Sequence, residues 1–203
     1  MMSEGIFETI RVEDGQIFGL HRHHCRAKDA AATLGFEIPD EDQVKAATEV
    51  VISKENYSLA RLRLKFNRNG ELGIDYEPYE DPKKPAELMI FDQRNPDFQI
   101  RFKEYPYKNY EILEFAKAQG FDDAILIAPD DQVAETSMAT LALKIEGQWI
   151  TPPLSAGILN GVVRALCIES DLLQVRKVMS NELVKVESAL LLSSLRNAQN
   201  VGV

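Results

Sequence analysis

The stretch Ala124–Arg164 reads AILIAPDDQVAETSMATLALKIEGQWITPPLSAGILNGVVR and contains the signals that decide the fold. It opens with Ala124–Ala128, an apolar run that is typical of a buried strand. Strands are also predicted at Leu141–Leu143 and from Trp149, with a glycine turn between them. The stretch closes with Gly157–Arg164, which predicts a tight loop that opens a helix.

Two features of this stretch indicate a ligand. Glu135 is followed by small or hydroxylic residues, so its surroundings are expected to be narrow and partly dry. An anion fixed in this way can hold a proton on a heterocyclic nitrogen. The helix start near Gly161 offers backbone N–H groups and a positive dipole end, which suit a phosphate. A site that protonates a ring and also cradles a phosphate suggests pyridoxal phosphate.

Three pieces of the stretch resemble one enzyme family. Val133–Glu135, Trp149–Pro153 and Gly157–Arg164 resemble the class IV aminotransferases, which are the fold-type IV pyridoxal-phosphate enzymes. This family includes branched-chain and D-amino-acid aminotransferases and 4-amino-4-deoxychorismate lyase. The compact length and the ending Leu190–Arg196 are most similar to the lyase branch. The resemblance runs from about Gly5 to Arg196, and it implies the family's two-lobed fold for nearly the whole chain.

The remaining pattern predicts strands and helices in both halves and no internal repeat, which indicates an α+β fold with two lobes. We place the N-terminal lobe at residues 1–92 and the C-terminal lobe, with the cofactor lysine and glutamate, at residues 93–203. The predicted strands outside the stretch lie at Gly5–Val12, Ile17–Leu20, Leu59–Phe66, Leu72–Tyr76, Leu88–Phe91, Phe98–Lys103 and Leu190–Leu195. The predicted helices lie at His21–Leu34, after an N-cap at Asp40, at Tyr110–Gln119 and at Gly161–Ser170, and Asp92–Asp97 is a candidate linker.

A lysine that bonds covalently to the cofactor is required by this chemistry, and Lys103 is the first candidate. It ends the predicted strand Phe98–Lys103, so its amine is expected to project from a rigid element. In the compact lyase-like members the reactive lysine precedes a tyrosine or similar residue by seven positions, as Lys103 precedes Tyr110. Lys108 is the alternative, because Lys108–Tyr110 resembles a lysine with a nearby Asn-Tyr in other members. The distance in sequence to the strand at Ala124 favours Lys103.

The resemblance also implies which residues bind the cofactor's phosphate and ring. His23–Arg26 is similar to the family's helical histidine-x-x-arginine, whose arginine binds the phosphate, and a guanidinium can grip phosphate at two points. Backbone N–H groups at Val162 and Val163 are expected to complete the phosphate site. Glu135 is expected to keep the pyridine nitrogen protonated.

Three positions depart from the family's pattern. Many members have asparagine where this chain has Thr140 and threonine where it has Val163, and compact members often have asparagine where it has Ser193. The valine removes one hydroxyl contact from the expected phosphate site, whereas the backbone N–H groups remain.

The cations of the predicted strand Leu59–Phe66 permit two interpretations. Arg61 and Arg63 share one strand face with Lys65, and they form either a solvated face or the site that reads a substrate carboxylate. Arg101 has the same ambiguity. Phe7–Thr9 resembles the family's opening strand, which lines the substrate side.

Composition narrows the class of protein. A chain of 203 residues with 45% hydrophobic and 27% charged residues is ordinary for a globular protein. Its net charge of −9 argues against nonspecific nucleic-acid binding. Two distant cysteines favour a reducing, cytoplasmic compartment, and the spacing of cysteine and histidine predicts no metal site. We also expect neither a signal peptide nor a membrane helix.

The sequence therefore predicts a pyridoxal-phosphate enzyme that resembles 4-amino-4-deoxychorismate lyase, which forms 4-aminobenzoate and pyruvate for folate synthesis. The alternatives are an aminotransferase acting on branched-chain or D-amino acids and a non-catalytic module with the same fold. We expect a small, amino-acid-like substrate and a homodimer, as in related enzymes.

Overall fold

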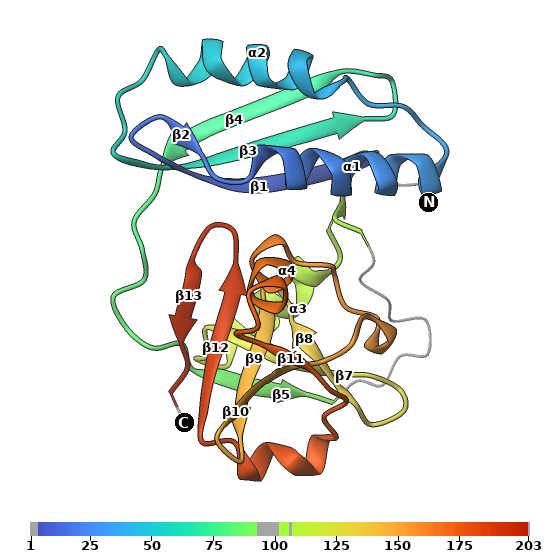
Figure 1. Ribbon diagram of the computed structural model, residues 1–203, viewed down its shortest axis with the longest axis vertical. Coiled ribbons are helices and arrows are strands. Elements are labelled where there is room, and N and C mark those ends of the chain that lie inside the picture. Colours follow the sequence, from blue (N-terminus) through green and yellow to red (C-terminus); the bar gives the residue numbers. More distant parts are fainter. Residues whose placement is uncertain (1–3, 93–101, 106, 203) are drawn as a thin grey trace. The chain divides into compact units, whose positions relative to one another are not determined.

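The computed structural model describes residues 4–92, 102–105 and 107–202, which belong to two compact units (Figure 1). The first unit comprises Met1–Asp81 and Phe102–Tyr107, and the second comprises Pro82–Arg101 and Lys108–Val203. Each unit combines sheets with helices, so the predicted α+β class is confirmed. The boundary predicted after residue 92 stays a prediction, because most of the candidate linker and most of the predicted strand Phe98–Lys103 lie outside the described residues.

The first unit is built on an antiparallel sheet. Its strands are β1 (Gly5–Glu13), β2 (Gln16–Ile17), β3 (Leu59–Asn67), β4 (Leu72–Pro78) and β6 (Glu104–Tyr105). The order is β2-β1-β3-β4, and β6 pairs with the start of β1. The close approach of β6 explains Gly5, because a Cβ there would lie 2.2 Å from the carbonyl oxygen of Phe66 and 2.9 Å from the hydroxyl of Tyr105.

Two helices cover one face of this sheet, α1 (Leu20–Leu34) and α2 (Glu41–Ile52) (Figure 1). The alternating apolar residues of β1 and β3 face small residues of α1 and Val44 of α2 across a buried core. The N-cap predicted at Asp40 is confirmed as a capping box, in which Asp40 accepts from the N–H of Gln43 at 2.8 Å and the Gln43 side chain accepts from the N–H of Asp40 at 3.0 Å.

The second unit contains two sheets. The three-stranded sheet has the order β5-β7-β8, and the five-stranded sheet has the order β11-β10-β9-β12-β13. The strands are β5 (Leu88–Phe91), β7 (Asp123–Ile127), β8 (Val133–Thr136), β9 (Thr140–Ile145), β10 (Gln148–Thr151), β11 (Gln174–Val175), β12 (Ser188–Ser193) and β13 (Asn197–Asn200). The helices are α3 (Asn109–Ala118) and α4 (Val162–Glu169), with 3-10 turns at Leu154–Ala156 and Ser180–Lys185.

Strands β9 and β12 are apolar without strict alternation because both faces of their sheet are covered. Leu141 and Leu191 pack into the core between the two sheets, whereas Ala142 and Leu192 pack on the opposite face with Val163 of α4. A strand with two buried faces needs apolar residues at successive positions, so this arrangement accounts for the continuous apolar runs in the sequence.

Two predicted boundaries differ from the structure. The hairpin partner predicted at Ile17–Leu20 pairs with β1 only at Gln16–Ile17, because α1 begins at Leu20. The buried strand predicted as the final one, Leu190–Leu195, corresponds to β12, which stops at Ser193. It is not the last strand, because the polar strand β13 follows it. None of the helices in the described ranges combines the length and apolar character that crossing a bilayer requires.

Candidate active site

A buried carboxylate organises the polar residues of the first unit. Glu8 lies on the face of β1 that packs against α1, and only 3% of its surface is exposed. Arg26 donates from Nε to Glu8 Oε1 at 2.9 Å and from Nη2 to Glu8 Oε2. His23 Nδ1 lies 2.6 Å from the same Oε2. One carboxylate therefore contacts both the histidine and the arginine of the histidine-x-x-arginine motif, His23 and Arg26.

The charges of this cluster follow from burial and pairing. Burial by itself would raise the pKa of Glu8, but the charge of Arg26 and the hydrogen bond from His23 hold it well below its usual range. Burial lowers the pKa of His23 despite the opposing influence of Glu8, so the imidazole is neutral and its Nδ1 is the donor. Within the described part of the chain, His23 Nε2 is buried without a hydrogen-bond partner.

Lys103 lies beside β1, directly before β6. Its carbonyl oxygen accepts from the N–H of Phe7 at 2.8 Å, and its Nζ lies 5.5 Å from the centroid of the Phe7 ring. Lys103 is half-buried, whereas Lys108, at the N-cap of α3, is exposed. The amine of Lys103 thus lies against an aromatic ring, a partly desolvated setting that Lys108 lacks.

The Phe7 ring also contacts Arg63 and Tyr107. The Arg63 guanidinium lies 5.0 Å from the ring centroid, and Tyr107 meets the ring edge-on at 5.3 Å. The Nε of Arg63 is buried and, among the described residues, has no hydrogen-bond partner. Its neighbours on the strand differ, because Arg61 pairs with Glu77 and Lys65 pairs with Asp75 at 2.8 Å. The two cations beside Arg63 are therefore neutralised on the sheet surface.

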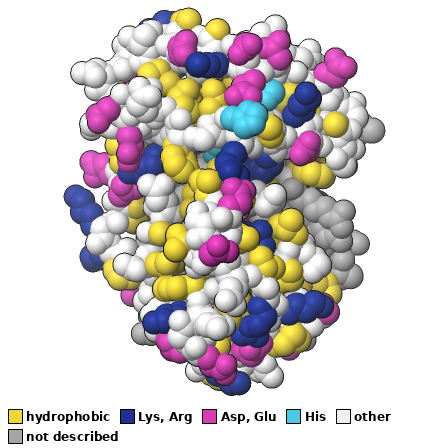
Figure 2. Space-filling view, viewed as in Figure 1, with side chains coloured by type: hydrophobic (Ala, Val, Ile, Leu, Met, Phe, Trp, Pro, Cys, Tyr) yellow, Lys and Arg dark blue, Asp and Glu magenta, His cyan; other side chains and the backbone are white. Residues whose placement is uncertain are grey.

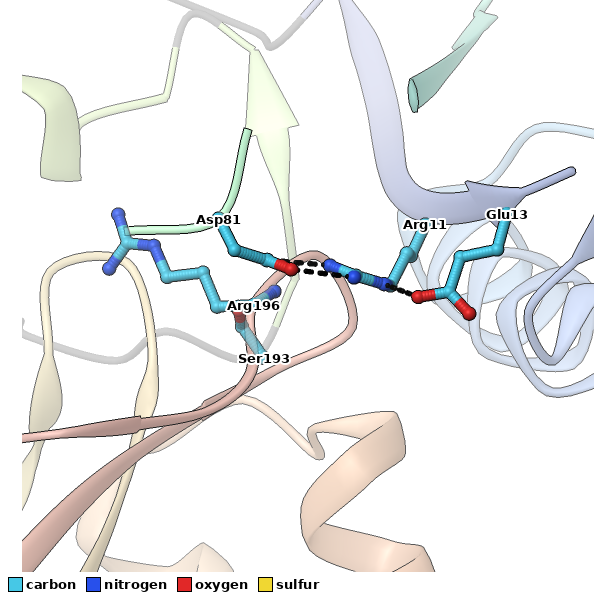
Figure 3. Close-up of polar contacts among 5 residues, drawn as sticks. All are labelled: Arg11, Glu13, Asp81, Ser193 and Arg196. Atoms are coloured by element: carbon cyan, nitrogen blue, oxygen red, sulfur yellow. Dashed lines mark hydrogen bonds and ion pairs between the residues drawn. The ribbon is translucent and has the colours of Figure 1, made fainter. Parts of the chain in front are cut away.

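β1 also carries a buried cation, Arg11, whose partners are acidic residues (Figure 3). Its Nη1 and Nη2 donate to the two carboxylate oxygens of Asp81, each at 2.7 Å, and its Nε donates to Glu13 at 2.6 Å. The hydrogen bond to Asp81 raises the pKa of Arg11 and lowers that of Asp81. This pair ties the connector after β4 back to β1.

In the second unit, Glu135 lies in β8 with 4% of its surface exposed. Its Oε1 accepts from the backbone N–H of Leu159 at 3.1 Å. Leu159 belongs to the loop before α4, and its carbonyl oxygen accepts from the N–H of Gly161 at 2.9 Å. Hydrogen bonds through the backbone of Leu159 therefore connect Glu135 with Gly161, the residue at the N-cap of α4.

A second buried carboxylate fixes the turn that follows Glu135. Asp123 of β7 is fully buried, and it accepts from Thr136 Oγ1 at 2.8 Å, from the N–H of Ser137 at 3.1 Å and from Ser137 Oγ. The side chain of Asn109 donates to the Ser137 carbonyl at 2.9 Å. These bonds anchor the chain on the C-terminal side of Glu135 to β7 and α3.

The start of α4 packs closely against Thr140. A Cβ at Gly161 would lie 2.9 Å from Thr140 Oγ1, so only glycine permits this approach. The backbone N–H groups of Val162 and Val163 lie in the first helical turn, where N–H groups have no partner inside the helix. Arg164 is buried and donates to Thr151 Oγ1 at 3.3 Å and to the Pro152 carbonyl at 2.9 Å. Burial lowers the pKa of Arg164, and the charge of Glu135 opposes this effect.

The other singled-out residues have local partners. His24 Nε2 lies 2.9 Å from the Pro39 carbonyl, and His21 Nδ1 lies 2.7 Å from Glu41. No group of three or more histidine, cysteine or acidic residues in the described ranges is arranged to hold a metal. Ser193, one of the departures from the family pattern, accepts from the N–H of Arg196 at 3.2 Å (Figure 3).

Sequence reasoning missed Glu8, Asp123, Arg164 and Asn109 as organising residues. The sequence contained a signal for Glu8, which shares one face of the predicted strand with the apolar residues Ile6 and Ile10. Since an acidic residue is almost never fully buried unless it is paired, a carboxylate on that phase predicts basic or N–H partners. Figure 2 shows acidic and basic side chains interspersed on the visible surface, in contrast to these buried charges.

Comparison with known proteins gives consistent matches. A family model described as amino-transferase class IV matches residues 5–202. A protein of Schizosaccharomyces pombe with the provisional name aminodeoxychorismate lyase is 27% identical over 180 residues, which cover 84% of this chain and 75% of that protein. A protein of Methanocaldococcus jannaschii, provisionally named a branched-chain-amino-acid aminotransferase, is 27% identical over 196 residues, which cover 83% of this chain and 66% of that protein.

Solved structures share the fold. A hypothetical aminotransferase from Mycobacterium tuberculosis, determined with α-ketoglutarate and PMP bound, superposes with a TM-score of 0.85 at 22% identity. The match covers 98% of this chain and 80% of that chain. At this identity the likeness shows the fold.

Proposed function

The chain belongs to the class IV aminotransferase family, and from this premise we propose that it is a pyridoxal-phosphate-dependent lyase of the 4-amino-4-deoxychorismate type. The observation that carries the proposal is the link between the buried Glu135 and the start of α4 through the N–H of Leu159. Within the second unit, this link connects Glu135, which we assign to the ring nitrogen, with the loop that leads into α4, whose start we assign to the phosphate. The S. pombe relative, named as a lyase, favours the lyase over other reactions of the family.

The residues of this chain fit the proposed cofactor. The close packing of Gly161 on Thr140 leaves the first turn of α4 without a side chain at its N-cap, which suits a phosphate. In the first unit, the guanidinium of Arg26 is oriented and only partly buried. We assign Arg26 and the backbone N–H groups of Val162 and Val163 to the phosphate. The PMP-bound M. tuberculosis structure supports this cofactor.

Lys103 and Glu135 are assigned the chemical roles. Lys103 Nζ would hold the cofactor covalently at rest and, once released, move the proton at the substrate's α-carbon. Lys103 is half-buried beside Phe7, whereas Lys108 is exposed. Glu135 would hold the proton on the pyridine nitrogen. When bound, pyridoxal phosphate supplies an electron sink that stabilises negative charge developing on the substrate.

Arg63 is the best candidate on β3 to bind a substrate carboxylate. Arg61 and Lys65 have acidic partners on β4, whereas Arg63 stacks on Phe7 and has a buried Nε without a partner in the described residues. A buried donor of this kind is costly unless a ligand satisfies it. The predicted alternative Arg101 lies outside the described residues.

The second candidate function is transamination of a branched-chain or D-amino acid. The M. jannaschii relative, named as a branched-chain-amino-acid aminotransferase, supports transamination. Its identity to this chain is 27%, the same as that of the S. pombe relative named as a lyase. The cofactor residues serve both reactions, so they do not separate the two. For either reaction we propose a homodimer, since a chain of 203 residues in two units has little bulk to cover a cofactor.

The deciding experiment measures pyruvate released from 4-amino-4-deoxychorismate by the protein loaded with pyridoxal phosphate, without any keto-acid acceptor. The lyase proposal expects catalytic turnover under these conditions, with Lys103→Ala as the inactive control. Turnover that requires an added keto acid would reject the lyase in favour of the aminotransferase. A parent protein that binds no pyridoxal phosphate would reject both.

A further inference from the structure

The start of α4 carries no polar side chain at its N-cap or at its first two positions. Gly161 is the N-cap, and Val162 and Val163 follow it. The third helical residue, Arg164, is buried and donates to the last residue of β10 and to the residue after it. A ligand at this helix start therefore meets backbone N–H groups and any polar group that another element supplies.

A neighbouring strand supplies a hydroxyl at this place. A Cβ at Gly161 would lie 2.9 Å from Oγ1 of Thr140, the first residue of β9, and 3.5 Å from the Cβ of Arg164. The side chain of an N-cap residue normally reaches toward the N–H of the third helical residue, which is Arg164 in α4. The Thr140 hydroxyl thus lies where a capping side chain of α4 would begin.

The Thr140 hydroxyl differs from other buried hydroxyls of the second unit in having no partner. Thr136 donates to Asp123 at 2.8 Å, and Thr151 accepts from Arg164 at 3.3 Å. Only 4% of the surface of Thr140 is exposed, and within the described ranges its hydroxyl forms no hydrogen bond. Since a buried polar group is costly unless it is hydrogen-bonded, this hydroxyl calls for a ligand.

A phosphate is the ligand that matches these donors. The free N–H groups of the first helical turn and the helix dipole attract an anion. A threonine hydroxyl rotates freely and can donate its hydrogen to an oxygen of the same anion. Both contributions come from one place, because the hydroxyl packs against the N-cap residue itself.

We infer that the Thr140 hydroxyl donates a hydrogen bond to the phosphate of pyridoxal phosphate, beside the backbone N–H groups of Val162 and Val163. This inference rests on the proposed function, which places that phosphate at the start of α4. Thr140 would supply a hydroxyl contact that the valine at position 163 does not offer. All of these residues belong to the second unit, so the inference requires no contact from the first.

The test compares side chains at position 140 with and without a hydroxyl. Thr140→Val keeps the branched shape and removes the hydroxyl, and Thr140→Ala removes it from a smaller side chain. Thr140→Ser keeps the hydroxyl. The matched control is Thr48→Val in the first unit, where an equally buried threonine donates to the Lys45 carbonyl at 2.8 Å.

The affinities of the apo-proteins for pyridoxal phosphate, unphosphorylated pyridoxal and inorganic phosphate are measured. Thr140→Val and Thr140→Ala should each weaken pyridoxal phosphate and inorganic phosphate by roughly tenfold, the effect of losing one hydrogen bond to a charged group, and leave pyridoxal unchanged. Thr140→Ser and Thr48→Val should bind all three ligands as the parent does.

Three results would overturn the inference. The first is unchanged phosphate affinity in Thr140→Val. The second is an equal loss for pyridoxal and pyridoxal phosphate, which would show that Thr140 only supports the fold. The third is a loss in Thr140→Ser as large as that in Thr140→Ala, which would show that size and not the hydroxyl decides.

The comparison of Thr140→Ala with Thr140→Ser decides the question even where Thr140→Val fails to fold, because both side chains are smaller than threonine. A parent that binds no pyridoxal phosphate rejects the proposed function, and the inference falls with it. A parent that binds pyridoxal phosphate while its Thr140 variants bind equally well overturns the inference alone.

Discussion

Replacing Arg26 with alanine is expected to destabilise the first unit strongly, apart from any effect on a ligand. The substitution removes both hydrogen bonds that Arg26 makes to Glu8 and leaves this buried carboxylate with His23 alone. The side-chain exposures are 15% for Arg26 and 4% for Glu8, so water cannot readily replace the lost donors.

The magnitude follows from the cost of leaving a charge buried without its partner. Breaking a buried ion pair from one side costs ~3–5 kcal/mol in the free energy of unfolding. The retained bond to His23 places the expected loss near the lower end, at ~3 kcal/mol. For a chain of this length each kcal/mol lowers the melting temperature by ~2–4 °C, so the expected loss is roughly 6–12 °C.

The loss should depend on pH and on Glu8. Without Arg26, burial raises the pKa of Glu8, so protonation relieves part of the cost as the pH falls, and the variant should be less impaired at pH 5 than at pH 8. The double variant with Glu8→Gln should be more stable than the sum of the two single changes predicts.

Urea unfolding of the apo-proteins at both pH values measures these differences. Arg26→Ala within ~0.5 kcal/mol of the parent, the range of ordinary surface substitutions, would refute the assigned packing of Glu8. Additive single changes would refute the coupling. Arg26→Lys, which keeps the charge but not the two-pronged bond, is the control for interpreting cofactor binding.

Four further outcomes are expected. Lys103→Ala should abolish the borohydride-trapped cofactor adduct, and mass mapping of that adduct to Lys108 in the parent would transfer the assignment. Glu135→Gln should keep the cofactor bound but lower turnover by ~10²–10⁴-fold; turnover within about threefold of the parent would exclude its role. The pKa values of Glu8 and Asp81 are lowered in the folded state, so the stability that these carboxylates contribute is present above pH ~4.5 and is lost as the pH falls. Glu8→Gln should therefore make the melting temperature depend less on pH between pH ~5 and ~3. The same pH dependence of the melting temperature in parent and variant would contradict this. The protein should sediment as a dimer at micromolar concentration, and a 22.9 kDa species alone would contradict the proposed homodimer.

Local patterns in the sequence determined the elements whose signals come from near neighbours. The N-cap at Asp40 and the helix that follows it depend on residues three or four positions apart, and both are confirmed. The strand at Ala124–Ala128 and the helix start at Gly161 are confirmed for the same reason. The resemblance carried by Val133–Glu135 and Gly157–Arg164 was sufficient to identify the family.

Two strands depended on pairings that no local pattern records. The polar residues of β13 form a strand because β12 offers them its free edge, and β6 is ordered by pairing with Gly5 and Ile6, about a hundred residues earlier. Hydrophobic periodicity does not detect such strands, since their stability comes from backbone hydrogen bonds to a partner and not from an apolar face.

The organisation of the site also came from the tertiary structure. The sequence supplied Arg26 and Glu135 as separate candidates, but Glu8 is 18 residues from Arg26 and Leu159 is 24 residues from Glu135. A buried carboxylate needs donors from whichever segment the fold brings within about 3 Å, and composition or spacing does not specify that segment. The sequence alone therefore determined which residue types bear the chemistry, and the packing of α1 on β1 and of the Leu159 loop on β8 decided which atoms hold them in place.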